Sequence, residues 1–441
     1  MQARHIAVNI LNRIENTDAY TDITLAHELS GTNMSVRDRH FVTELVNGTI
    51  RWLLRLDWII RLYFQGDYEK CPLKIRNVLR SALYQIMFLD KVPNYAAISE
   101  AVTLAKKLKG AFWGRKVNAI LRSIDRNLDG IEYPDAKTQP VDYLAIKYSH
   151  PVWLVEKWYQ RFGFDGTKNL LQYNNIPPKH TLRVNTLKIS AQELQVRLRE
   201  FDIETTISNF AGECLITKRL PNLDAFSLFQ DGLFSIQDES AALVARLVDP
   251  KPGELILDLC AAPGGKTTHL AELSKNLSRI VAVDIYLNRL QLVKNAAQRL
   301  GHKSIFPVNA DALQISGITA DKVLIDAPCS GLGVLAKRSD ARWKKTPEQL
   351  FELGILQKEI LNNAAGLVKT GGYLIYSTCT IEPEENEQQV DRFLKEHPDF
   401  KIDFPADRFH RKLLKENNYI FTIPHIHNMD GSFATRFIKT G

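Results

Sequence analysis

Long apolar runs are missing from this 441-residue chain, and a helix that crosses a bilayer needs about 20 such residues in succession. The first ten residues contain Arg4 and His5 where a secretory signal would have a continuous apolar core. We therefore expect a cytoplasmic protein that has no membrane partner. With 45% hydrophobic and 24% charged residues, the composition is that of a folded chain and excludes a disordered one.

Cysteine is scarce, and its five occurrences are scattered at Cys71, Cys214, Cys260, Cys329 and Cys379. An odd number of cysteines in so long a chain does not indicate a disulfide framework. The spacing also lacks the paired pattern of a structural zinc site. We expect reduced thiols and no metal.

The chain has only a small excess of one charge sign, with 57 Lys and Arg against 50 Asp and Glu. Residues 1–140 contain 20 of the basic and 15 of the acidic residues, and the excess is concentrated at 106–126. A basic surface attracts polyanions such as nucleic acid. A pair of solvated helices with ordinary surface lysines explains this stretch equally well.

Apolar residues recur at helical intervals over the first 130 or so residues, as from Phe41 to Leu56 behind a capping Ser35. The pattern predicts an all-helical domain at 1–135. Glycine and prolines then break the periodicity, which predicts a linker at 136–150. Residues 151–238 mix helical and strand-like segments, including 181–185 and 234–237, and predict a small α+β subdomain of RRM-like type.

After Pro250, short apolar runs alternate with amphipathic helices, and the runs lie at 255–259, 280–284, 323–326 and 373–377. Strand and helix in alternation predict an α/β domain at 239–441 with a mostly parallel, doubly wound sheet. Such sheets bind ligands at the carboxyl ends of their strands. Asp258, Asp284, Asp326, Cys329 and Cys379 all fall at such ends.

The turn after the first run contains small residues, which let the backbone approach a ligand beside a helix N-terminus. It is not a Walker A loop, because the glycine required five residues before Gly265 is Cys260. Asp284 stands where a carboxylate binds ribose hydroxyls in adenosine-binding sheets, and Asp311 is placed to contact the adenine edge. Together they favour an adenosine-type cofactor.

The segments Cys260–Lys266, Val283-Asp284, Asp326–Gly331 and Thr378-Cys379 resemble those of 16S ribosomal RNA cytosine-5 methyltransferases of the Sun/Fmu family. The resemblance extends from about residue 237 to 433. It implies a Rossmann-like methyltransferase domain, S-adenosylmethionine as cofactor, a NusB-like RNA-binding domain at the N-terminus and 16S ribosomal RNA as partner. We expect the protein to be a monomer.

Carbon 5 of cytosine is a poor nucleophile, so a thiolate must first add at carbon 6, and a base must later remove the carbon 5 proton. By resemblance, Cys379 is the nucleophile, Cys329 assists product release and Asp326 contacts the cytosine ring. Lys266 is a further catalytic candidate, with a role in stabilising charge near Asp326 or the cofactor, and a helix cap is its alternative role. The predicted cofactor-binding residues are Cys260, Ala261, Ala262, Pro263, Gly264, Gly265, Lys266, Asp284, Asp311 and Asp326, although packing is an alternative role for Cys260.

Basic residues surround Trp343 in the segment 337–345, which suits contacts to flipped or single-stranded RNA, and a solvated loop is the alternative. Two other functions stay open. The same chemistry acting on transfer RNA is one, and a non-catalytic RNA-binding assembly factor is the other.

Overall fold

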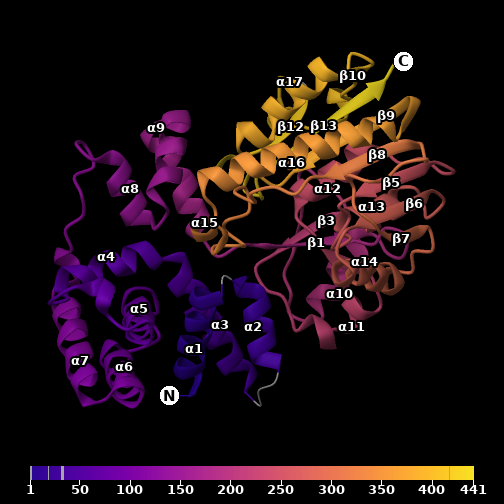
Figure 1. Cartoon of the computed structure of the whole chain (residues 1–441). Helices are drawn as coiled ribbons and strands as arrows, with labels where there is room; N and C mark the ends of the chain where they lie inside the picture. Colours follow the sequence, from indigo (N-terminus) through magenta and orange to yellow (C-terminus); the bar gives the residue numbers. More distant parts are fainter. Residues whose placement is uncertain (1, 18, 31–33, 417) are drawn as a thin grey trace. The chain divides into compact units, whose positions relative to one another are not determined.

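The computed structural model describes residues 2–17, 19–30, 34–416 and 418–441 (Figure 1). The chain forms two compact units. One consists of Met1–Ile176 with Arg338–Lys344, and the other of Pro177–Lys337 with Lys345–Gly441. Along the chain, the two units meet at residues 176, 338 and 344, which are not the predicted domain limits of 135, 150 and 238, and those limits stay predictions.

The first unit is helical, as the periodicity predicts. Ser35 Oγ accepts a hydrogen bond of 3.1 Å from the backbone N–H of Asp38, so the predicted cap is confirmed. The predicted linker 136–150 contains one of the helices, because Pro140 starts it and Asp142 lies in its first turn. The helices are α1 (Gln2–Thr17), α2 (Thr21–Ser30), α3 (Val36–Arg51), α4 (Leu53–Tyr63), α5 (Leu73–Phe88), α6 (Asn94–Lys109), α7 (Ala111–Arg126), α8 (Pro140–Tyr148), α9 (Val152–Asn175) and α15 (Ala341–Lys344).

The second unit begins with a small antiparallel sheet of order β2-β3-β1-β4. Its strands are β1 (His180–Val184), β2 (Thr206–Ile207), β3 (Cys214–Thr217) and β4 (Phe234–Ile236), with helices α10 (Ala191–Arg199) and α11 (Ser227–Gln230). Ser190 and Glu193 form a capping box at the start of α10. Buried Leu182, Leu194 and Phe234 form its core, so the predicted α+β character is confirmed.

The larger sheet has nine strands within the described residues, in the order β11-β12-β13-β9-β8-β5-β6-β7, with β10 paired to β13. Its central part, β7-β6-β5-β8-β9, is parallel as predicted, whereas β13, β12, β11 and β10 are antiparallel additions. The strands are β5 (Leu255–Leu259), β6 (Arg279–Asp284), β7 (Ile305–Asn309), β8 (Ala320–Asp326), β9 (Val368–Thr378), β10 (Phe400–Ile402), β11 (Leu414–Lys415), β12 (Tyr419–Thr422) and β13 (Ser432–Lys439).

Helices cover the parallel strands, which explains why these strands are apolar without alternation. Leu257, Leu259, Leu324 and Ile325 are all buried. In Figure 1, α14 lies beside β7 and α16 beside β8 and β9, and α12 packs on α13. The helices are α12 (Glu239–Val248), α13 (Gly265–Leu273), α14 (Leu287–Leu300), α16 (Pro347–Gly366), α17 (Glu387–Glu396) and α18 (Pro424–His427).

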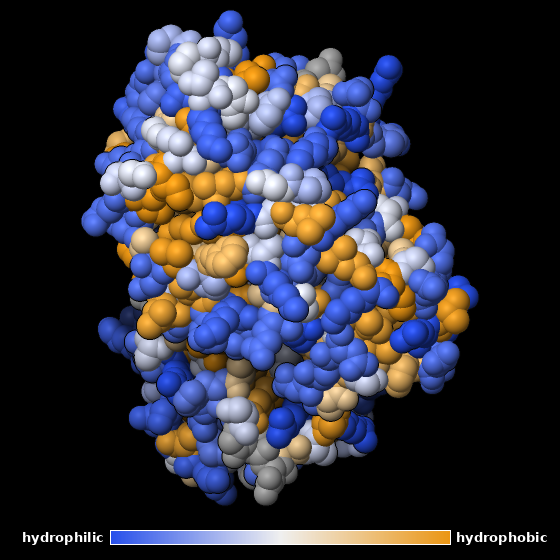
Figure 2. All heavy atoms as spheres, turned by 90° about the vertical axis from the view of Figure 1, so that its right-hand side faces the viewer, coloured by the Kyte–Doolittle hydropathy of each residue, from blue (hydrophilic) through white to orange (hydrophobic). Residues whose placement is uncertain are grey.

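Figure 2 shows hydrophobic side chains interspersed with hydrophilic ones over the visible face. Among the described residues, none of the helices is both long and apolar enough to span a membrane.

Candidate active site

The two cysteines meet because the strands that precede them are neighbours. β8 and β9 run parallel with Asp326 opposite Ser377, so the segments that follow leave the sheet side by side. The Cys329 and Cys379 sulfur atoms are 3.1 Å apart, and the backbone N–H of Cys379 donates to Cys329 Sγ over 3.3 Å. The structure therefore brings together the pair that the sequence places 50 residues apart.

The surroundings of Cys329 favour its protonated form. The hydrogen bond with Cys379 and burial raise the pKa of the Cys329 thiol well above its usual range, and the charges of Cys379 and Glu385 add to this effect. At neutral pH this sulfur consequently keeps its proton, directly beside the second sulfur.

Lys266 and Asp326 form an ion pair at this end of the sheet. Lys266 Nζ is 2.7 Å from Asp326 Oδ2, and Ser377 Oγ donates to Asp326 Oδ1 over 3.2 Å. Burial alone would lower the pKa of Lys266, but the Asp326 carboxylate outweighs it and leaves that pKa raised. The Asp326 side chain is 33% exposed, so its carboxylate is oriented by protein contacts and still open to a ligand.

The predicted cofactor turn joins β5 to α13 and depends on a backbone that few residues can adopt. Gly264 has a left-handed φ of +100°, and a Cβ atom there would approach the Cα atom of Val293 to 3.1 Å. A glycine is therefore required at the entrance of α13. Burial raises the pKa of Cys260 to about 12, which leaves an inert thiol and fits the packing role.

Asp284 lies at the end of β6 and holds the cofactor turn in place. Its Oδ2 atom accepts from the backbone N–H of Ala262 over 3.2 Å, and its Oδ1 atom accepts from that of Tyr286 over 3.0 Å. Asn309 Nδ2, at the end of β7, donates to the carbonyl oxygens of Asp284 and Ile285 over 2.9 and 3.0 Å. Sequence reasoning did not assign Asn309 to this site, although its strand-end position was the available signal.

Asp258, the penultimate residue of β5, is buried with half of its carboxylate unsatisfied. Its Oδ2 atom accepts from Thr267 Oγ1 over 2.6 Å, but its Oδ1 atom has no hydrogen-bond partner in the described structure. Burial raises the pKa of Asp258 to about 7. By contrast, Asp311 Oδ1 accepts from the backbone N–H of Leu313 over 3.0 Å, so Asp311 caps a turn, and its contact to adenine stays a prediction.

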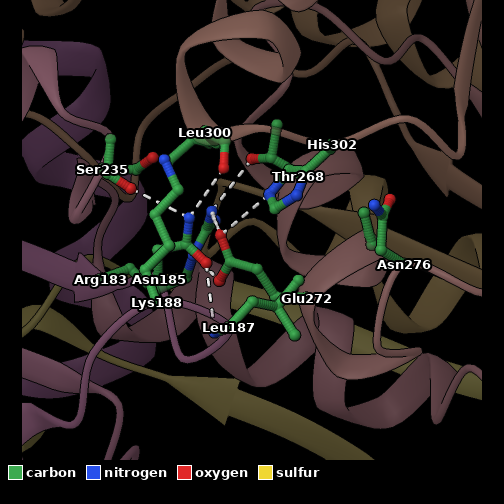
Figure 3. A network of polar contacts seen from close by, with 12 residues as sticks. Arg183, Asn185, Leu187, Lys188, Ser235, Thr268, Glu272, Asn276, Leu300 and His302 are labelled. Carbon is green, nitrogen blue, oxygen red and sulfur yellow. Dashed lines mark hydrogen bonds and ion pairs between the residues drawn. The ribbon is translucent and has the colours of Figure 1, made fainter.

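A buried arginine supports the cofactor turn from the small sheet (Figure 3). Arg183 on β1 donates to both carboxylate oxygens of Glu272 over 2.8 and 3.1 Å, and to the carbonyl oxygen of Gly265 over 2.6 Å. Figure 3 shows Arg183 and His302 both pointing toward Glu272. Burial alone would raise the pKa of Glu272, but Arg183 and His302 outweigh it, so this pKa is lowered. The cofactor turn and the small sheet are thus joined by a charged network.

The predicted RNA contacts of segment 337–345 are corrected at two positions. Arg342 is fully buried and donates to the carbonyl oxygens of Ser149 and Asn174 over 3.0 and 3.1 Å, so it is not available to RNA. Lys337 is engaged with the carboxylates of Asp238 and Asp430. Arg342 belongs to the first unit, whereas Lys337 belongs to the second.

Known proteins resemble this chain over its whole length. The model of the family described as 16S rRNA methyltransferase RsmB/F matches residues 245–438. The NusB family matches residues 1–126, and the ferredoxin-like domain of RsmF/B-like methyltransferases matches residues 150–222. A relative from Bacillus subtilis, named "Probable ribosomal RNA small subunit methyltransferase B", is 37% identical over 99% of each chain. The chain belongs to this methyltransferase family.

Further comparisons extend this result to other bacteria and to solved structures. Ribosomal RNA small subunit methyltransferase B of Yersinia pseudotuberculosis is 33% identical over 92% of each chain. The crystal structure of PH0851 has a TM-score of 0.81 at 29% identity, covering 100% of this chain and 99% of the other. A methyltransferase homologue from Pyrococcus horikoshii has a TM-score of 0.59 at 29% identity, over 68% of this chain and 99% of its own. The predicted fold class is thereby confirmed.

The methyl donor of this family is S-adenosylmethionine, and the residues at the strand ends fit it. The unpaired Oδ1 atom of Asp258 offers an acceptor, which suits a cofactor that bears an ammonium group. Asp284 closes the next strand in the position that suits ribose hydroxyls. Gly264, which has no Cβ, lets the cofactor turn pack against Val293 and enter α13 directly, so the turn lies beside a helix N-terminus.

Proposed function

We propose that this protein methylates carbon 5 of a cytidine in 16S ribosomal RNA through a covalent adduct between Cys379 and carbon 6. The pair of thiols beside a cofactor turn is the observation that carries the proposal. When bound, S-adenosylmethionine supplies the methyl group. The names of the relatives support ribosomal RNA as the substrate.

The different surroundings of the two cysteines support a division of roles. The contact with Cys379 and burial raise the pKa of Cys329, which suits a thiol that donates a proton, and the resemblance assigns the attack to Cys379. After methyl transfer the proton on carbon 5 must be removed before the sulfur can leave. Cys329 lies 3.1 Å from the attacking sulfur, so its thiol can donate its proton to that sulfur as the carbon 6–sulfur bond breaks, while a separate base takes the carbon 5 proton.

Asp326 and Lys266 complete the proposed site. Addition of a thiolate at carbon 6 places negative charge on the cytosine ring, and positive charge and hydrogen bonds beside the ring stabilise it. Asp326 is partly exposed beside the thiols and can hydrogen-bond that edge of the ring. Lys266 holds the carboxylate in place and supplies positive charge next to it.

Methyl transfer from labelled S-adenosylmethionine to unmethylated 16S ribosomal RNA tests the function. We expect incorporation at one cytidine, mapped by its resistance to bisulfite, and none into transfer RNA. Incorporation into transfer RNA alone would show that transfer RNA, and not 16S ribosomal RNA, is the substrate. No incorporation into either RNA would contradict the proposed function and favour a non-catalytic RNA-binding assembly factor.

The division of roles has its own test. Cys329→Ala should accumulate a protein–RNA adduct that survives denaturation, because attack by Cys379 proceeds while release fails. Cys379→Ala should form no adduct. Adduct formation by Cys379→Ala and not by Cys329→Ala would reverse the assignment.

A further inference from the structure

A buried carboxylate lies behind the two thiols and contacts the segments that carry them. Glu385 belongs to a short 3₁₀ turn, Pro383–Glu385, and is fully buried. We define the Pro-Cys loop as residues 327–333 and the Thr-Cys turn as residues 378–382. Such burial of an acidic side chain is unusual and requires hydrogen-bond partners.

The partners of Glu385 on the Pro-Cys loop flank Cys329. Its Oε1 atom accepts from the backbone N–H of Ser330 over 2.8 Å, and its Oε2 atom accepts from the Ser330 hydroxyl. Gln357 Nε2 on α16 donates to Glu385 Oε1 over 3.0 Å and to the carbonyl oxygen of Pro328 over 2.8 Å. The residues on both sides of Cys329 are therefore fixed through one carboxylate and one amide.

The same network extends to the Thr-Cys turn. Thr380 Oγ1 is 2.9 Å from Ser330 Oγ, so the residue after each cysteine meets its counterpart. Asn386, next to Glu385, accepts from Thr378 Oγ1 over 2.6 Å and donates to the carbonyl oxygen of Thr380 over 3.1 Å. The segments on both sides of Cys379 are consequently fixed as well.

We infer that Glu385 is a positioning residue that holds the Cys329 and Cys379 sulfur atoms at the separation which attack and release require. Loops that carry chemistry must be held to within a fraction of an ångström, and supporting hydrogen bonds provide this restraint. Glu385 does not contact either sulfur in the described structure. It acts through Ser330, whose backbone and hydroxyl it binds.

The inference rests on the proposed function only for its catalytic consequence, and the geometry can be tested without RNA. Diamide oxidises two adjacent thiols to a disulfide: both sulfurs lose their hydrogen, and the diazene is reduced to the hydrazine. The rate of Cys329–Cys379 closure, measured by mass spectrometry, reports how often the sulfurs are in contact. We expect Glu385→Ala to close this disulfide at least about tenfold more slowly than the wild type, the slowing that 1.4 kcal/mol produces.

Conservative variants separate positioning from general destabilisation. Glu385→Gln should retain most of the wild-type closure rate, because its amide can still accept from the Ser330 N–H while donating to the Ser330 hydroxyl. Thr380→Val preserves shape but removes the contact to Ser330, and should slow closure less than Glu385→Ala. Glu387→Gln is the matched control, because Glu387 is two residues away and pairs with Lys415.

Adduct formation with RNA gives the second readout. In the Cys329→Ala background, Glu385→Ala should slow adduct formation about 100-fold at saturating S-adenosylmethionine and RNA. Disulfide closure and adduct formation at wild-type rates in Glu385→Ala would overturn the inference. A slowing of both reactions in Glu385→Gln equal to that in Glu385→Ala would overturn it as well. If Glu385→Ala does not fold, Thr380→Val decides the matter, because disulfide closure at the wild-type rate in Thr380→Val would contradict the positioning role of the Glu385 network. Wild-type protein that closes the disulfide but transfers no methyl group would reject the proposed function alone.

Discussion

Arg183 offers the sharpest test of how this fold supports its cofactor turn. The Arg183 and Glu272 side chains are 0% and 1% exposed, and Arg183 also donates to Thr268 and Gly265. Removing one partner of a buried ion pair costs about 3–5 kcal/mol, because the remaining charge stays buried without compensation. We expect Arg183→Met to destabilise the second unit by this amount, since Met replaces the stem but none of the donors.

The loss should depend on pH in a defined direction. In the wild type the lowered pKa of Glu272 contributes stability above the unfolded-state value of 4.5, and this contribution is lost as the pH falls. Without Arg183, burial raises that pKa instead, so ionising Glu272 becomes unfavourable as the pH rises. The difference between wild type and Arg183→Met should therefore be largest near pH 7 and shrink toward pH 5. Adding Glu272→Gln should recover about 2 kcal/mol, since it removes the unpaired charge.

Urea unfolding with amide hydrogen exchange of peptides from β1 and α13 measures the effect. All six tryptophans lie in the first unit, so their fluorescence monitors that unit separately. Arg197→Met on the exposed side of α10 is the control and should change stability by less than about 0.5 kcal/mol. A loss below about 1 kcal/mol for Arg183→Met, or no recovery with Glu272→Gln, would refute the argument.

Three further predictions follow from buried charges. Burial raises the pKa of Asp258 from 3.8 to about 7, so ionising it in the folded state is unfavourable. In the cofactor-free wild type the free energy of unfolding should therefore fall by up to about 4 kcal/mol as the pH rises from 4 to 7, and urea denaturation of Asp258→Asn should not show this pH dependence. Lys266→Met, which removes the partner of Asp326, should lower methyl transfer about 100-fold while calorimetry shows cofactor affinity changed less than tenfold. Arg342→Met should destabilise the first unit by about 2–4 kcal/mol in tryptophan-detected unfolding, because buried carbonyl groups lose their donor.

The strands that build the site could be predicted because their sequence pattern follows from burial on both faces. The runs at 255–259, 280–284, 323–326 and 373–377 all lie within strands β5, β6, β8 and β9. Parallel strands expose their carboxyl ends at one edge, so Asp326 and the two cysteines could be placed together from sequence. The sequence leaves Lys266 with three possible roles, at Asp326, at the cofactor or as a helix cap, and the structure pairs it with Asp326.

Other features depend on pairings that no local pattern encodes. β13 pairs antiparallel with β9 across more than 50 residues, and β10, β11 and β12 are too short to give a periodic signal. The segment 337–345 looks like an exposed basic loop in the sequence, yet Arg342 is buried, and carbonyl oxygens of α9 and of the turn before it accept hydrogen bonds from its guanidinium group. A positive charge in sequence does not reveal whether RNA or protein carbonyl groups will be its partner.

The separation of the two cysteine sulfur atoms is not determined by the pairing of their strands alone. Neighbouring parallel strands bring the Pro-Cys loop and the Thr-Cys turn to one edge of the sheet, but the pairing of β8 with β9 ends at Asp326 and Ser377 and does not include the cysteines. Three residues beyond Asp326 and one beyond Thr378, the backbone is no longer held by the sheet. The 3.1 Å separation of the sulfur atoms therefore needs a second set of restraints, and Glu385 with Ser330 and Thr380 supplies it. Because Glu385, Ser330 and Thr380 are buried, the partly exposed thiol pair can be reactive without being mobile.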